Sequence, residues 1–139
     1  MGVASATVEL STRGEGHAID ITAQLTDAVT SSGLRNGVTH VFVVGSTAAI
    51  TTIEFEPGCV HDLSEMFERI APRDAGYLHH ERWGDHNGHS HMRASLLGPH
   101  LAVPLVDGEL TLGRWQQVIL VDFDDRPRHR KVVVQTIGE

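Results

Sequence analysis

The sequence lacks several features that would mark a specialised class of protein. Cys59 is the only cysteine, which excludes an intrachain disulfide and a cysteine-rich zinc site. No apolar run approaches the ~18 residues of a membrane-spanning helix, and no signal-peptide pattern is seen, so we expect a cytoplasmic protein without a membrane partner. Basic residues number 11 against 18 acidic ones, and the net charge of −7 argues against nucleic-acid binding.

What is present is typical of one globular domain. The chain has 139 residues, of which 40% are hydrophobic and 21% charged. This length suffices to bury a core, so residues 1–139 are expected to form a single domain. Because the net charge is negative, any anionic ligand would have to be held locally by Arg, His and backbone N–H groups.

The periodicity of apolar residues predicts mostly hairpins with two main helices. Residues 4–10 alternate between apolar and polar, as in a half-buried strand. Pro104 is expected at a sheet edge or bulge. The order indicates an α+β fold with an antiparallel sheet or sandwich. Helices are predicted over Asp20–Thr30, Val60–Ala71 and, shorter, Ser90–Leu97, and strands over Val38–Val44, Ala48–Phe55, Leu101–Val106, Leu110–Leu112, Trp115–Phe123 and Lys131–Thr136.

Five of the ten histidines lie between His79 and His91, in a segment without the apolar pattern of a core element. If the segment is extended, His89 and His91 share a face and could bind one ion; if Ser90 opens a helix, their rings diverge. Adding His80 gives a three-imidazole site for a divalent metal such as zinc, with a position left for water or substrate. The alternative is a solvated loop in which some histidines cap helices.

Two short segments could bind phosphate. Gly45-Ser46-Thr47 joins two predicted strands, and its hydroxyl and N–H groups could cradle a phosphate, although a tight β-connection would look the same. Arg126, Arg128 and Arg130 surround a predicted turn and could meet a phosphate. The alternative for these arginines is a solvated turn.

Other side chains have two interpretations each. Glu54 ends a predicted strand and could be a general acid or base, or could simply face solvent. His61 begins the second predicted helix and could reach a site or point into water. Trp115, followed by Gln116, is predicted for the core, with a pocket wall or subunit contact as the alternative. Cys59 has no neighbour that marks a nucleophile, and we expect it to be structural.

Short motifs follow one another along nearly the whole chain: Gly45-Ser46-Thr47-Ala48-Ala49, Glu54, Pro57-Gly58, His61-Asp62, His80, Asn87-Gly88-His89-Ser90-His91, Ser95-Leu96-Leu97-Gly98, Val103-Pro104, Gly108-Glu109-Leu110, Leu112-Gly113-Arg114-Trp115-Gln116, Pro127-Arg128 and Gly138-Glu139. In this order they resemble the YjbQ-like family, also labelled secondary thiamine-phosphate synthase. The resemblance implies an antiparallel α+β sandwich with two main helices, assembled as a homotrimer.

The same resemblance suggests a site and an activity. It implies clefts at or near subunit boundaries, where the histidine box and Trp115-Gln116 could gather. Family members have been associated with thiamine-phosphate synthesis, in which a pyrimidine pyrophosphate joins a thiazole phosphate and pyrophosphate leaves. His80 and His91 match the most persistent family histidines of this region, and His89 matches part of the family. His79 and His86 are expected to be peripheral.

The chain departs from the family pattern at two positions. Many members carry a histidine where this chain has Gly45, so any role of that histidine is absent here or has moved. Members usually have a small residue before the Trp-Gln pair, whereas this chain has Arg114, which could enter the pocket and change ligand choice.

These observations lead to one main hypothesis and two alternatives. The main hypothesis is an enzyme acting on a small phosphorylated metabolite. The alternatives are a zinc-dependent phosphoester hydrolase, because a three-imidazole site suits zinc better than Mg²⁺, and a non-enzymatic metal- or metabolite-binding trimer. The expected site comprises catalytic Glu54, His61 and His91, ligand-binding Ser46, Thr47, Trp115, Gln116 and Arg128, and metal ligands His80, His89 and His91.

Overall fold

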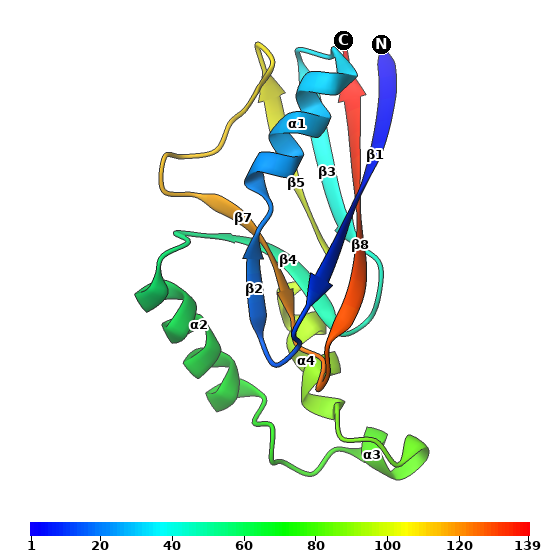
Figure 1. The fold of residues 1–139 in the computed structure, drawn as a ribbon, viewed down its shortest axis with the longest axis vertical. Coiled ribbons are helices and arrows are strands. Elements are labelled where there is room, and N and C mark those ends of the chain that lie inside the picture. Colours follow the sequence, from blue (N-terminus) through cyan, green and yellow to red (C-terminus); the bar gives the residue numbers. More distant parts are fainter.

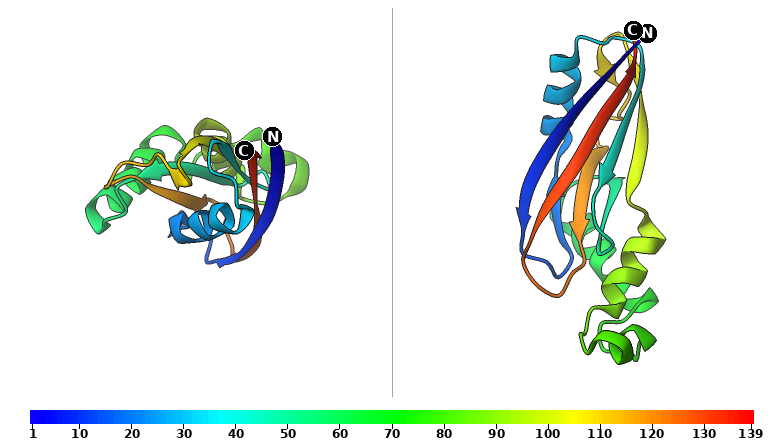
Figure 2. Two further views of the ribbon diagram at one scale, coloured as in Figure 1. Left: turned by 90° about the horizontal axis from the view of Figure 1, so that it is seen from above. Right: turned by 90° about the vertical axis from the view of Figure 1, so that its right-hand side faces the viewer.

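Two antiparallel sheets pack face to face in the computed structural model, which describes residues 1–139 (Figures 1 and 2). This confirms the predicted α+β class with antiparallel sheets. The first sheet has the order β1-β8-β3-β5-β6, with β1 (Gly2–Thr12), β8 (Arg128–Gly138), β3 (Gly37–Val43), β5 (His100–Val106) and β6 (Glu109–Leu110). The second has the order β2-β7-β4, with β2 (His17–Asp20), β7 (Gln117–Asp122) and β4 (Ala48–Ile53).

Four helices surround the sheets: α1 (Thr22–Ser32), α2 (Pro57–Ile70), α3 (Leu78–Trp83) and α4 (Gly88–Leu97). Helix α1 packs near β1 and β8, whereas α3 and α4 lie together at the end of the molecule where β8 begins (Figure 1). None of the helices is long and apolar enough to cross a bilayer.

Strand β7 forms the centre of the core because both of its faces are covered. Val118 and Leu120 point into the cluster between the two sheets. Ile119 and Val121 point the other way, into a second cluster with Phe67 of α2. A strand buried on both faces loses the apolar–polar alternation, which is why this stretch reads as a continuous apolar run.

Helix α2 and strand β7 begin at other residues than predicted, each for a physical reason. Helix α2 begins at Pro57. Proline has no backbone N–H, but in the first turn of a helix that N–H would have no partner, so nothing is lost. The Glu56 carboxylate caps the helix by accepting hydrogen bonds from the N–H groups of Gly58 and Cys59. The sequence prediction started this helix at Val60, three residues too late. Strand β7 begins only at Gln117, because a turn closed by the Gln116 N–H and the Gly113 carbonyl, 3.0 Å apart, precedes it.

Two further predictions were wrong. Trp115 is 63% exposed, so it is not part of the core. The histidine segment contains helix α3, which buries none of its residues and therefore has no apolar stripe to reveal it. Asp107 and Gly108 form the turn between β5 and β6, and both residues have positive φ. Pro104 lies beside the end of the two-residue strand β6, close to the sheet edge, as predicted.

Candidate functional site

A buried ion pair lies at the end of the molecule that carries α3 and α4. Arg130 donates from Nε and Nη2 to the two carboxylate oxygens of Asp122, over 2.7 and 2.9 Å. The side chains are 3% and 0% exposed. The Thr12 hydroxyl also donates to Asp122, over 2.7 Å. Burial alone would raise the pKa of Asp122, but these hydrogen bonds outweigh it and hold the pKa below its usual value. Arg130 is thus a buried structural residue, and the prediction of a solvated turn was wrong for it.

Asp124 extends this buried pair toward the surface. Its carboxylate accepts hydrogen bonds from the Thr47 hydroxyl at 3.0 Å, from Arg128 Nη1 at 3.0 Å and from Asn87 Nδ2 at 3.4 Å. The Asp125 N–H adds another at 2.8 Å. Burial again works against ionisation, yet the hydrogen bonds keep the pKa of Asp124 below its usual value. Asp124 is therefore an ionised carboxylate that joins a loop, a helix start and a turn.

The Gly45-Ser46-Thr47 loop rests directly on this network. The Thr47 hydroxyl accepts from Arg130 Nη2 over 2.6 Å while donating to Asp124. Gly45 has φ +129°, and a Cβ there would lie 2.6 Å from Arg130 Nη1. Both facts favour glycine, and any side chain at this position would strain the loop in this conformation. Ser46, between the two, is exposed.

His91 is the predicted site residue that lies beside this loop. Its ring is half-buried and meets the His79 ring edge to face, with centroids 4.4 Å apart. Burial lowers the pKa of His91, and positive charge on His79 lowers it further, while the nearby Ser46 backbone and Asp124 act in the opposite direction. His91 is therefore neutral at pH 7 and has a lone pair to offer.

His79 connects His91 to the buried network. Its Nε2 lies 3.1 Å from Asn87 Oδ1 and 3.4 Å from Asp85 Oδ1. Asn87 in turn donates to Asp124. The prediction that His79 is peripheral therefore does not describe its contacts.

The other two predicted metal ligands have different environments. His80 Nε2 accepts the Gly88 N–H over 2.9 Å and so caps the start of α4. His89 is 1% exposed, and burial, followed by the charges of Arg93 and Arg73, lowers its pKa. Because Ser90 lies within α4, His89 and His91 diverge, as the helical alternative predicted. No group of three His, Cys, Asp or Glu side chains in the chain is arranged to hold a metal ion.

Four predicted residues lie away from this site within one chain. Thr47 immediately precedes β4 and Glu54 immediately follows it. Because seven residues of extended chain span roughly 20 Å, Glu54 lies far from Thr47. His61 is exposed in the first turns of α2. Trp115 stacks under Arg114, 4.8 Å from the ring centroid, and Gln116 donates to Thr52 over 3.2 Å. The β6–β7 connection that holds them lies far from α3 and α4 (Figure 1).

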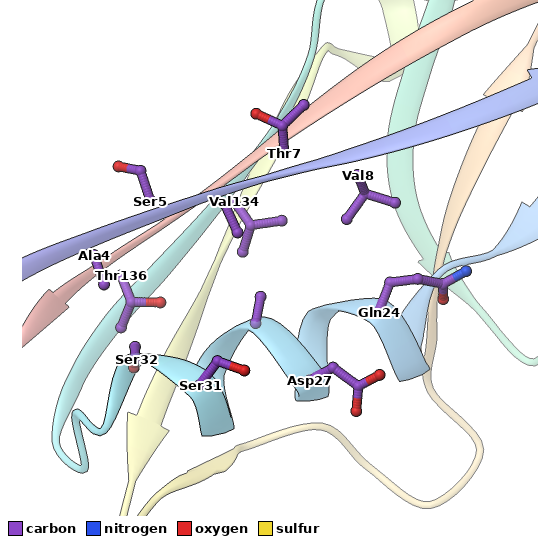
Figure 3. Close-up of a pocket in the computed structure, with 12 residues that line it drawn as sticks. Ala4, Ser5, Thr7, Val8, Gln24, Asp27, Ser31, Ser32, Val134 and Thr136 are labelled. Atoms are coloured by element: carbon purple, nitrogen blue, oxygen red, sulfur yellow. The ribbon is translucent and has the colours of Figure 1, made fainter.

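Two hollows were compared with the predicted site. One adjoins the α3–α4 end and is lined by Arg73, Asp74, Ala75, His80, His86 and Asp125. The other is a groove between β1, β8 and α1, shown in Figure 3, where the only charged lining residue is Asp27. An acidic group without a cation would repel phosphate, so the groove does not suit the predicted ligand. The first hollow contains one cation, Arg73, beside Asp74 and Asp125.

Sequence reasoning missed His79, Asn87, Asp122 and Asp124. Asp122 and Asp124 were visible as polar residues ending a long apolar strand, with three arginines just beyond. That combination could have indicated a buried ion-pair network, because charges next to a core are rarely left unpaired.

Comparison with known proteins agrees with these motifs. The family model described as UPF0047 protein YjbQ-like matches residues 6–139. The chain belongs to this YjbQ-like family. Curated relatives include a UPF0047 protein of Methanothermobacter thermautotrophicus, 40% identical over 87% of this chain and 82% of the relative. UPF0047 protein YjbQ of Salmonella typhimurium is 31% identical over 96% of both chains.

Solved structures show the same YjbQ-like fold. A YbjQ-like protein of unknown function from Sulfolobus solfataricus P2 superposes with a TM-score of 0.89 at 29% identity, over 99% of this chain and 100% of that one. A YjbQ/UPF0047 family protein from Clostridium acetobutylicum gives a TM-score of 0.86 at 33% identity, over 95% and 99%. The family resemblance seen in the sequence is thus confirmed, and these relatives are described without a function.

Proposed function

We propose that the α3–α4 end binds a small phosphorylated metabolite and catalyses transfer or displacement of its phosphate-bearing group. One observation carries the proposal: the Ser46-Thr47 loop, His91 and Arg128 come together over Asp124, although they are far apart in the sequence. The named candidate reaction is thiamine-phosphate synthesis, in which pyrophosphate is the leaving group. The fold alone would not support this, because one fold hosts many activities.

The chemistry of these groups suits an anionic ligand. The exposed Ser46 offers a hydroxyl and a backbone N–H, and Arg128, which is 36% exposed, keeps donors besides the one bound to Asp124. His91 is neutral at pH 7 and can accept a proton. Glu54 is too distant to share this site in one chain, so the proton transfers are assigned to imidazoles.

The test is turnover by purified protein with the two thiamine precursors and with a panel of phosphoesters, followed by release of phosphate or pyrophosphate. His91→Asn should reduce the rate about 10²- to 10⁴-fold, the usual contribution of a general acid or base. His129→Asn is the matched control, because His129 is exposed on β8. Equal rates for the wild type and His91→Asn would refute the proposal.

A divalent metal, with zinc the leading candidate, fits the chain less well. His80 already uses Nε2 to accept an N–H, and His89 and His91 point away from each other. The three predicted ligands therefore do not converge in one chain, and we assign no step to a metal. Elemental analysis of the purified protein tests this: one zinc per chain would revive the hydrolase and metal-binding alternatives.

We further propose that the protein assembles as a homotrimer in which a neighbour completes the site. The support is the division of the predicted residues into two distant groups, one of them including the exposed Trp115. His91→Ala and Trp115→Ala should each be inactive alone. Mixed, unfolded and refolded together, they should recover part of the activity, because some sites then combine two wild-type halves. No recovery would place the whole site in one chain.

A further inference from the structure

The orientation of Asn87 follows from the charge of Asp124. Asp124 is an ionised carboxylate and can only accept hydrogen bonds. The Asn87 side chain must therefore turn its NH₂ group toward Asp124 Oδ1, 3.4 Å away. Its carbonyl oxygen, Oδ1, then faces His79 Nε2 at 3.1 Å.

The orientation of Asn87 in turn fixes the proton on His79. An amide oxygen can only accept, so His79 Nε2 must carry the hydrogen. Asp85 Oδ1 lies 3.4 Å from the same nitrogen and finds no other hydrogen-bond donor, which also favours a proton there. In the neutral ring the lone pair is consequently left on Nδ1.

We propose that His79 is the second acid–base residue of this site, acting from Nδ1 beside His91, and that Asn87 is the positioning residue that holds it in this tautomer. The inference rests on the proposed function and adds to it a division of labour between two histidines. The ring centroids are 4.4 Å apart, so both rings can reach one bound phosphate group.

The division of labour can be written for transfer from a phosphoester to water. His91 takes a proton from the water as its oxygen bonds to phosphorus. His79 begins this step protonated on both ring nitrogens; as the bond between phosphorus and the ester oxygen breaks, the departing oxygen receives the Nδ1 proton and Nε2 keeps its hydrogen. His91 ends protonated and His79 neutral, and exchange with solvent restores both. The lowered pKa of His91, caused by burial and then by charge on His79, agrees with His91 as the base.

The experiment is NMR of protein labelled with ¹⁵N in histidine, which reads the tautomer without any substrate. In the neutral ring of His79, Nε2 should carry the hydrogen and Nδ1 should be unprotonated. Asn87→Ala should weaken the preference for this tautomer at His79, because only Asp85 Oδ1, 3.4 Å from Nε2, then remains to accept its hydrogen. The exposed His86, for which no hydrogen bond is seen, is the internal control and should be unchanged. A protonated Nδ1 in the neutral wild type, or no response to Asn87→Ala, would overturn the inference.

Two additions keep the outcome decisive. If Asn87→Ala does not fold, the wild-type spectrum still decides the tautomer. Inorganic pyrophosphate added near neutral pH should protonate His79 Nδ1 in the wild type, and less so in Asn87→Ala; bound pyrophosphate that leaves Nδ1 unprotonated contradicts the acid role. If pyrophosphate shifts no signal at all, the proposed phosphate site fails, and with it the acid role, while the tautomer result stands separately.

Discussion

At the scale of single residues, the site depends on buried charges that would be costly without partners. Asp122 and Arg130 are almost fully buried and satisfy each other through two hydrogen bonds. Removing one partner of such a pair leaves an uncompensated charge and typically costs about 3–5 kcal/mol. Thr47 accepts a hydrogen bond from Arg130 and donates one to Asp124. The buried pair therefore fixes the position of the loop that carries Ser46.

Gly45 gives a direct test of this arrangement. Gly45→Ala should lower the free energy of unfolding by about 1–3 kcal/mol, because it combines an unfavourable φ with a contact against Arg130. Gly76→Ala is the matched control, since a Cβ there meets nothing within 4 Å and its φ is not positive. Urea denaturation of both variants provides the measurement. Equal stability would mean that the loop is not held against Arg130.

His89 should make stability depend on pH. Its pKa is lowered in the folded state by burial and then by neighbouring arginines. Between the unfolded value of 6.5 and the lower folded value, the unfolded chain binds more protons. The contribution of His89 to the free energy of unfolding is therefore complete above pH 6.5. It is lost as the pH falls toward the lower pKa that His89 has in the folded state. Urea denaturation at about pH 7.5 and about pH 5.5 should show a smaller decline in His89→Asn than in the wild type; identical declines would contradict this.

At the scale of elements, the helices and strands that bury an apolar face could be predicted from the sequence. Helices α1, α2 and α4 and most strands were predicted within a few residues, either from apolar residues at the period of the element or, for β7, from a continuous apolar run. Helix α3 could not be predicted in this way because none of its residues is buried. Of the proposed site, Ser46, Thr47, His91 and Arg128 were predicted from the sequence, whereas His79 and Asn87 depend on tertiary contacts that no local pattern encodes.

The start of α4 is held by an unusual cap, which gives a prediction at this scale. Asn87 at the N-cap makes no capping bond with its side chain, and His80 accepts the first helical N–H instead. His80→Ala should therefore cost about 1 kcal/mol, as loss of a cap usually does. Thermal or urea unfolding against His86→Ala, which removes an exposed ring, tests this. If both variants lose the same stability, His80 is not a cap.

At the scale of the whole molecule, the outer face of the first sheet is left without a covering element. Phe42, Val44, Val3 and Val106 are 46%, 52%, 65% and 49% exposed. On this face Phe42 pairs with Val133. These apolar side chains share the face with exposed polar residues such as Ser5 and Gln135, and contact with further copies would remove the apolar ones from water.

The assembly prediction concerns this face. Wild-type protein should have about three times its chain mass of 15.2 kDa in solution, and Phe42→Asp should shift it toward the monomer. Met66→Asp, on the exposed side of α2, serves as the control and should keep the wild-type mass. Light scattering after size-exclusion chromatography gives the answer. A monomeric wild type would contradict the trimer, and an unaffected Phe42→Asp would move the interface elsewhere.

The central claim is that Ser46, Thr47, His91 and Arg128 form one anion-binding site over Asp124. The most direct measurement is the amide ¹H–¹⁵N spectrum during titration with inorganic pyrophosphate. The account predicts saturable shifts concentrated at Ser46, Thr47 and His91, weakened in Arg128→Gln. Shifts confined to other parts of the chain, or no saturable shift at these three residues, would contradict it.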